Sequence, residues 1–81
     1  MAQNILRLPD VKLSCGLSRS TIYLRISQGL WPKPVSLGGR SVGWPALEVM
    51  AINTARIAGK TNEEIRQLIT KLERSRREGF E

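Results

Sequence analysis

The apolar positions in the first half of the chain predict a helix-turn-helix. Ile22 and Ile26 stand four residues apart, which is the spacing of one buried face on a helix over residues 19–28. Gly16 can take the backbone conformation that ends a preceding short helix, and Ser18 can cap the second helix with its hydroxyl. A short helix, a tight glycine turn and a second helix are the elements of this motif.

The segments on either side of the motif predict extended structure and a hairpin. Residues 5–8 form a short strand or an extended arm, and Pro9 then suits the first turn of the short helix over residues 9–15. Further along, residues 35–37 and 41–44 alternate apolar and small side chains around Gly38-Gly39 and predict a β-hairpin with a glycine turn.

The pattern after the hairpin predicts two more helices. The helix over residues 45–58 is apolar on nearly every side, so we expect it to be buried between two layers. The last helix runs to residue 77, and the Thr61 and Glu64 spacing predicts a capping box at its start. The apolar residues of the helix over 45–58 are Leu47, Val49, Met50, Ala51, Ile52 and Ala55.

The last helix carries a single apolar stripe that must be buried somewhere. Its members fall at the i, i+3, i+4 and i+7 positions of one helical face. We expect the stripe to pack on the helix over residues 45–58 of the same chain, with burial in a partner subunit as the alternative. The stripe consists of Ile65, Leu68, Ile69 and Leu72.

These elements predict a mainly α fold with a small β-hairpin, namely a winged helix-turn-helix followed by C-terminal helices. The 81 residues allow one folding unit with a modest core. Residues 1–58 are the expected DNA-binding domain with its supporting helix, and residues 59–81 the amphipathic helix packed on it. Trp31 and Trp44 adjoin proline and apolar residues and are expected core anchors, while the tail after Arg77 is expected to fray.

The charge distribution points to an anionic partner for the first half. The chain has a net charge of +6 at pH 7. Residues 1–44 hold six Lys and Arg against Asp10, a net +5, whereas residues 45–81 hold seven basic and six acidic residues, a net +1. A basic excess of this kind indicates an anionic partner, although solubility alone is the simpler alternative.

The composition offers no support for an enzyme. The chain has no histidine, and Cys15 is its one cysteine, so neither a Cys/His metal cluster nor an intrachain disulfide can form. Cys15 is expected to be a small buried residue. We expect no cofactor, metal or membrane span, and the lack of a signal-peptide pattern predicts a cytoplasmic protein that joins the nucleoid when bound to DNA.

The motif assigns DNA contacts to the second helix and to the hairpin. In a helix-turn-helix, the N-terminal residues of the second helix reach base edges in the major groove. Arginine can pair with guanine and a hydroxyl with several base edges, while a basic residue at the hairpin tip can contact phosphate or the minor groove. The alternatives are capping roles for the hydroxyls and solvated charges for the arginines. The candidate DNA-binding residues are Ser18, Arg19, Ser20, Thr21, Tyr23, Arg25 and Arg40.

Two stretches resemble the AlpA family of prophage regulatory proteins. They are Gly16-Leu17-Ser18-Arg19-Ser20-Thr21-Ile22-Tyr23 and the Pro-x-Pro-Val-x-Leu-Gly-Gly-Arg-x-Val-x-Trp pattern of residues 32–44, within a resemblance over residues 5 to about 52. The resemblance implies a MerR-like winged helix that binds DNA sequence-specifically and acts as an excisionase or as an activator of an integrase gene. It also implies DNA contacts by Ser18, Arg19, Ser20, Thr21, Tyr23 and Arg40.

The expected partners follow from this interpretation. They are double-stranded DNA, other copies of the chain on adjacent sites, and integrase or RNA polymerase. The C-terminal basic cluster, Arg74, Arg76 and Arg77, is expected either to be free for a neighbour or phosphate or to be a solvated helix end. Two other functions stay open: a protein-interaction adaptor or anti-repressor that uses the 61–77 stripe, and a DNA recognition module like a terminase small subunit.

Overall fold

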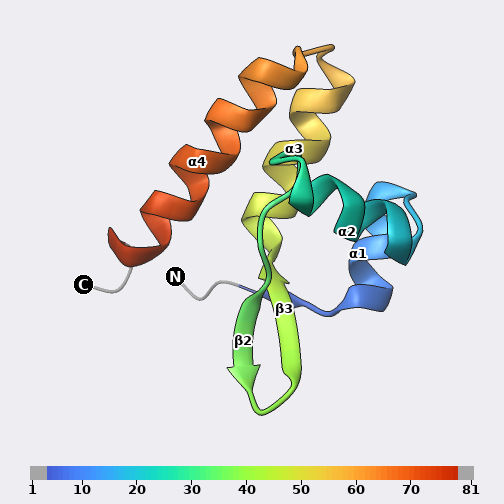
Figure 1. Ribbon diagram of the computed structural model, residues 1–81, viewed down its shortest axis with the longest axis vertical. Coiled ribbons are helices and arrows are strands. Elements are labelled where there is room, and N and C mark those ends of the chain that lie inside the picture. Colours follow the sequence, from blue (N-terminus) through green and yellow to red (C-terminus); the bar gives the residue numbers. More distant parts are fainter. Residues whose placement is uncertain (1–3, 79–81) are drawn as a thin grey trace.

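Four helices and three short antiparallel strands make up residues 4–78, the part of the chain that the computed structural model describes (Figure 1). The strands are ordered β1-β3-β2. This architecture confirms the predicted mainly α fold with a small β-hairpin: α1, α2 and the hairpin form a winged helix-turn-helix, and α3 and α4 follow it. In chain order the elements are β1 (Ile5–Leu6), α1 (Leu8–Cys15), α2 (Arg19–Ser27), β2 (Val35–Gly38), β3 (Ser41–Pro45), α3 (Ala46–Ile57) and α4 (Asn62–Glu78).

Local signals in the sequence set the turn between α1 and α2. Gly16 ends α1 with φ 71°, in the left-handed region that favours glycine, and its N–H donates to the Lys12 carbonyl. Ser18 caps α2, since its Oγ accepts a hydrogen bond of 3.2 Å from the Thr21 N–H. Both predictions for this turn are confirmed.

The hairpin forms where expected, but its turn lies one residue later. Val35 pairs with Gly43 and Ser36 with Val42, and an irregularity follows before Gly38 pairs with Ser41. Residues 39 and 40 therefore connect the strands, rather than the expected Gly38-Gly39. The irregularity shifts the register by one residue, which a sequence alternation alone does not predict.

The N-terminal strand β1 pairs with β3 beside a buried glycine. Ile5 pairs with Pro45 and Leu6 with Trp44. A Cβ at Gly43 would lie 2.5 Å from Ile5 Cγ2 and 3.0 Å from the Leu6 carbonyl oxygen. The close approach of β1 to β3 therefore requires glycine at this position. The expected strand over residues 5–8 is shorter than predicted, because α1 already begins at Leu8.

The hydrophobic core contains two tryptophans and residues from all four helices and from β3. Trp31 is 2% and Trp44 0% exposed, which confirms them as core anchors. The Trp44 indole N–H donates a 2.8 Å hydrogen bond to the Pro32 carbonyl, so the buried ring keeps a polar partner. The other buried apolar residues are Val11, Ile22, Leu30, Val49, Ile52, Ala55, Ile65 and Ile69.

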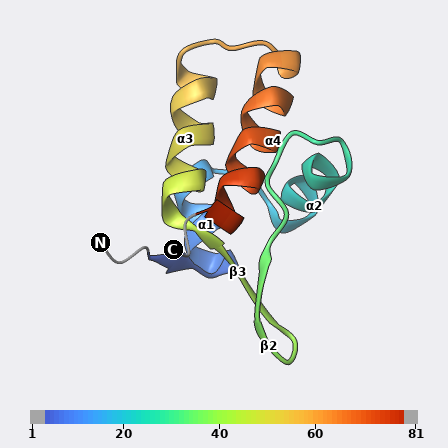
Figure 2. The ribbon, with the colours of Figure 1, turned by 90° about the vertical axis from the view of Figure 1, so that its left-hand side faces the viewer.

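The stripe of α4 packs on this same core. Ile65 and Ile69 are buried in it, and Leu68 and Leu72 are half-buried and pack against it. Figure 2 shows α4 running alongside α3. The Thr61 N–H donates to Glu64 Oε1 and the Glu64 N–H donates to Thr61 Oγ1, which confirms the capping box. The stripe is therefore buried within the chain itself, which is the first of the two expected locations.

Two burial predictions are wrong. Leu47, Met50 and Ile57 are 58%, 60% and 87% exposed, so α3 is not covered on all sides. The neighbours α1, β3 and α4 together cover only the face that carries Val49, Ile52 and Ala55. Cys15 is half-buried at the edge of the core rather than fully buried. The tail after Glu78 lies outside the described residues.

Candidate nucleic-acid interface

The helix α2 and the hairpin tip lie on the same side of the molecule (Figure 2). In Figure 2, α2 and the hairpin tip lie on the right, whereas α3 lies on the left. Ile22 points into the core and is fully buried, so the opposite face of α2 is left to solvent. The helix and the wing can therefore meet one duplex together.

Hydroxyl groups and one arginine gather at the N-terminus of α2. Ser18 Oγ donates to Thr21 Oγ1 over 2.9 Å and lies 3.3 Å from Ser20 Oγ. Thr21 is half-buried and bonded to Ser18, whereas Ser20 is exposed. Ser18, Arg19, Ser20 and Tyr23 line a shallow hollow at this end of the helix. Four candidate residues thus share one surface, and Ser18 and Thr21 also build the helix cap.

An aromatic contact connects this surface to the base of the wing. The Arg19 guanidinium carbon lies 5.3 Å from the centroid of the Tyr23 ring, in cation–π range. The Tyr23 ring in turn meets Trp44 edge to face, with centroids 6.4 Å apart and planes at 70°. Tyr23 is 37% exposed, so one side of its ring packs inward while the other is available to a ligand.

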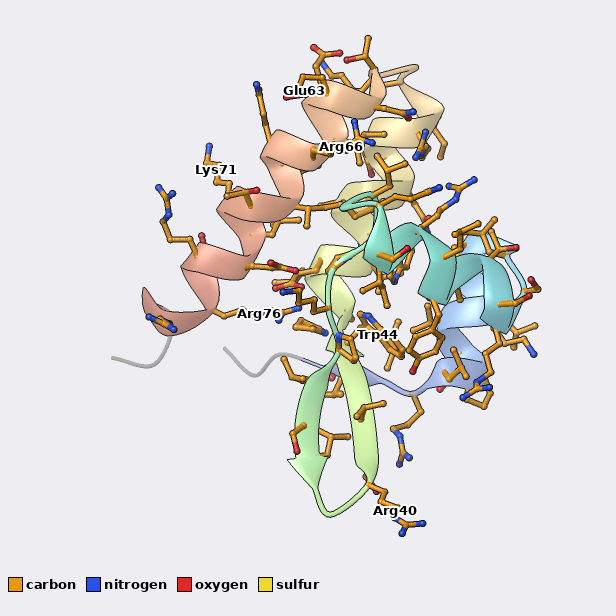
Figure 3. The ribbon with its side chains drawn as sticks, viewed as in Figure 1. Arg40, Trp44, Glu63, Arg66, Lys71 and Arg76 are labelled. Carbon is orange, nitrogen blue, oxygen red and sulfur yellow. The ribbon has the colours of Figure 1, made fainter. Side chains whose placement is uncertain are left out.

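Of the three candidate residues that do not line this hollow, Thr21 belongs to the helix cap, and Arg25 and Arg40 lie elsewhere. Arg40 lies at the tip of the hairpin and points away from the body of the molecule (Figure 3). Arg25 is half-buried on α2. Burial, and after it the positive charge of Arg25, lower the pKa of Arg56 on α3. The candidate residues therefore divide into a helix-end group, a wing tip and Arg25.

The structure adds two exposed residues that the sequence analysis did not select. Leu24 is 56% exposed one turn beyond Ser20, and Ser27 follows on the same face and donates to the Leu24 carbonyl over 2.6 Å. An apolar side chain here can contact a thymine methyl group. The four-residue spacing from Ser20 to Leu24 was a usable signal, because it puts both on one helical face.

The last helix holds the end of α2 and the segment that leads to the wing. Arg66 Nε donates to the Gln28 carbonyl over 3.0 Å, and Glu73 Oε2 accepts from the Lys33 N–H over 2.9 Å. Arg76 donates to the Lys33 carbonyl over 2.7 Å. These contacts place α4 against both ends of the connection between α2 and the hairpin.

One expectation about the C-terminal basic cluster is wrong. Arg76 is not free for a partner, because its Nε and Nη2 donate to both carboxylate oxygens of the buried Glu48, over 2.8 and 2.7 Å. The hydrogen bonds to Glu48 raise the pKa of Arg76. Arg74 and Arg77 remain exposed.

Residues 4–78 contain neither a membrane-spanning helix nor a cluster of metal ligands. No helix there is long and apolar enough to cross a membrane. No group of three or more Cys, Asp or Glu residues in that range is arranged to hold a metal ion.

The helix-turn-helix, its wing and the exposed face of α2 define a small winged-helix protein of the kind that regulates genes by binding DNA. The family model described as "Prophage CP4-57 regulatory protein (AlpA)" matches residues 4–56, and the chain belongs to that family. The resemblance seen in the sequence is thereby confirmed.

A relative from a phage is similar over most of the chain. The protein named "Uncharacterized protein ORF88" of Enterobacteria phage P4 is 52% identical over 58 residues, which are 72% of this chain and 66% of that protein. The chain thus spans just under two thirds of the length of this relative. No solved structure matches the chain significantly.

Proposed function

We propose that this protein is a sequence-specific DNA-binding regulator of a mobile element. It places α2 in the major groove and lays the hairpin on the adjacent backbone or minor groove. The observation that carries the proposal is the position of α2 and of the hairpin tip on the same side of the molecule (Figure 2), in the half of the chain with a net +5. Membership of a family of prophage regulators supports it.

The residue roles in this proposal follow from position. Arg19 and Ser20, in the first turn of α2, read base edges, and Leu24 meets an apolar edge deeper in the groove. Ser18 and Thr21 shape the helix end, whose unpaired N–H groups favour a phosphate. Arg40 contacts the backbone or the minor groove from the wing.

Salt dependence tests the proposal, with footprinting on the DNA that flanks the gene to locate the site. If about four to six phosphates are contacted, the slope of log affinity against log salt is about −4 to −5. A slope near zero, or no binding to any duplex in about 50 mM salt, contradicts DNA binding.

Within this function, we assign the protein the role of an excisionase, with regulation of the integrase gene as its second or alternative activity. An excisionase bends DNA so that integrase can assemble, and bending a site of 20–30 base pairs costs on the order of 1–6 kcal/mol. A single module covers only roughly 600–1,000 Å². Several copies on adjacent sites, together with integrase, are therefore needed to offset the bending cost.

A circular-permutation gel shift, paired with an excision assay on the host element, separates the two roles. Mobility that depends on the position of the site, together with loss of excision when the gene is deleted, supports the excisionase role. Straight DNA in the complex and normal excision leave an activator that contacts RNA polymerase at a promoter.

A protein-interaction adaptor is the second candidate, favoured by the exposed outer side chains of α3, Leu47, Met50 and Ile57. Exposed apolar groups along one helix are a common basis for protein contacts. The salt titration discriminates the two classes, because an adaptor of this kind binds no duplex at any salt concentration.

A further inference from the structure

The aromatic ring of Tyr23 has a charged neighbour on α2 and an aromatic neighbour in the core. The Arg19 guanidinium carbon lies over the ring, 5.3 Å from its centroid. The Trp44 ring meets it at 70°, with the centroids 6.4 Å apart. Trp44 is fully buried and Arg19 is exposed, so the inner side of the Tyr23 ring faces the core and its outer side carries the arginine. The group bound on the outer side of the ring is thus a guanidinium of the same chain.

The inner neighbour of this ring is held firmly. Trp44 is packed in the core, and its indole N–H donates a 2.8 Å hydrogen bond to the Pro32 carbonyl. A close-packed side chain with its polar group satisfied keeps one orientation. Trp44 belongs to β3 at the base of the wing (Figure 3), and Pro32 to the segment that leads to β2. The base of the wing therefore fixes the place of the Tyr23 ring.

The outer neighbour, Arg19, gains order from the ring without losing its hydrogen-bond donors. Tyr23 follows Arg19 by four residues, so the two share one helical face. Fixing a long, exposed side chain at the moment of binding costs entropy, and a side chain that is already ordered avoids part of this cost. Within residues 4–78 no carboxylate forms a salt bridge with Arg19. A cation–π contact leaves the N–H groups of the guanidinium open for the acceptors of a guanine.

We propose that Tyr23 is a positioning residue for base reading. Its ring, fixed by Trp44, holds the Arg19 guanidinium in the orientation that pairs with a guanine, and its hydroxyl is not needed for this. The proposal rests on the proposed function and deepens it. In place of the direct DNA contact expected for Tyr23, it gives this residue an action through Arg19. It also makes the base of the wing, and not only its tip, contribute to sequence recognition.

The test compares Tyr23→Leu, which removes the ring, with Tyr23→Phe, which keeps the ring and removes the hydroxyl. Affinities are measured for a duplex that contains the footprinted site and for a scrambled duplex of the same length and composition. The readout is the ratio of the two affinities, because partial unfolding of a variant lowers both by the same factor. We expect Tyr23→Leu to lower this ratio about two- to five-fold, as the loss of an exposed cation–π contact would do, and Tyr23→Phe to keep it.

A double-mutant cycle shows whether Tyr23 acts through Arg19. In the Arg19→Ala background no guanidinium remains to be positioned, so adding Tyr23→Leu should leave the affinity ratio unchanged. The same relative loss of the ratio in both backgrounds would mean that Tyr23 contacts the bases directly, and it would overturn the proposal. A loss in Tyr23→Phe as large as in Tyr23→Leu would also overturn it, because the hydroxyl would then be the group that matters.

NMR of the free protein provides a readout that needs no DNA. Protons held over the face of an aromatic ring resonate upfield of their usual position. The side-chain protons of Arg19 should show this shift in the wild type and in Tyr23→Phe, and should lose it in Tyr23→Leu. A wild type that binds its site but lacks the shift overturns the positioning role alone. A wild type that shows the shift but binds no duplex overturns the proposed function, and the positioning role with it.

Discussion

Arg76, near the end of α4, donates two hydrogen bonds, 2.8 and 2.7 Å long, to the buried carboxylate of Glu48 on α3. The same guanidinium donates to the Lys33 carbonyl in the segment that leads to the hairpin. One side chain therefore joins α4 both to the helix that supports the core and to the base of the wing.

Removing Arg76 should destabilise the fold strongly. Arg76→Ala leaves Glu48, whose side chain is 7% exposed, as a buried charge without its partner. Loss of one partner of a buried pair costs about 3 kcal/mol or more. Urea denaturation should show this decrease in the free energy of unfolding, while Arg74→Ala, on the exposed side of α4, changes it by less than about 0.5 kcal/mol. Equal stability of the two variants would contradict the role of the pair.

The packing of α4 predicts that residues 1–58 need the rest of the chain to fold. Ile65 is fully buried against the core, so Ile65→Ala should lower the free energy of unfolding by about 2–5 kcal/mol, whereas Gln67→Ala, exposed on the same helix, should not. A truncated chain of residues 1–58 should lack cooperative thermal unfolding by circular dichroism. A fragment that melts like the full chain would make α4 a dispensable addition.

Glycine at position 43 should be required for the attachment of β1. In Gly43→Ala the new methyl group would collide with Ile5 and with the Leu6 carbonyl. We expect a loss of about 1–3 kcal/mol in the free energy of unfolding, since overpacking at a close contact is costly. Adding Ile5→Ala should restore part of this loss, because the closest of these contacts, at 2.5 Å, is removed. Ile5→Ala alone serves as the reference, and no recovery in the double variant would refute the explanation.

Interactions between residues close in sequence were readable from the sequence alone. The turn at Gly16, the cap at Ser18 and the capping box of Thr61 and Glu64 depend on spacings of a few residues, and all three are in the structure. The pairing of Arg76 with Glu48 was not readable, because it joins residues 28 apart whose meeting depends on how α4 packs.

The same reason explains the errors about burial and orientation. The pattern of α3 identified its apolar residues but not which of its sides a neighbour would cover, so Leu47 and Met50 were misjudged. At the candidate site, the sequence identified the N-terminal residues of α2. The contact of Tyr23 with Trp44 depends on how the hairpin packs against α2, so no local spacing predicted it.

The capping box predicts a pH-dependent contribution to stability. The hydrogen bonds from the Thr61 N–H and hydroxyl lower the pKa of Glu64. A carboxylate with a depressed pKa stabilises the fold above its unfolded value, about 4.3, and loses this effect as the pH falls through the folded value. Thermal midpoints of wild type and Glu64→Gln should therefore converge as the pH is lowered from about 7 to 3. The control Glu63→Gln removes a charge from the same first turn without removing the cap. A midpoint difference that stays constant with pH for Glu64→Gln would contradict the prediction.

Arg19 and Arg40 should contribute differently to DNA binding: Arg19 should read the base sequence, and Arg40 should contact the DNA backbone. Arg19 lies in the first turn of α2, held over the Tyr23 ring, where it can pair with the acceptors of a guanine. Arg19→Ala should therefore cost roughly 1–3 kcal/mol on the specific site and less on random DNA, so that the ratio of the two affinities falls. Arg19→Lys should recover little of this ratio, because an ammonium group lacks the planar fork that pairs with guanine.

Arg40, at the hairpin tip, should act differently: Arg40→Ala should weaken both kinds of DNA alike and reduce the steepness of the salt slope by about 0.9 per lost phosphate. Titrations of the three variants on a footprinted site and on a scrambled duplex, at two salt concentrations, measure both quantities. Equal losses on both duplexes for Arg19→Ala would make Arg19 a backbone contact and would transfer base reading to Ser20 and Leu24.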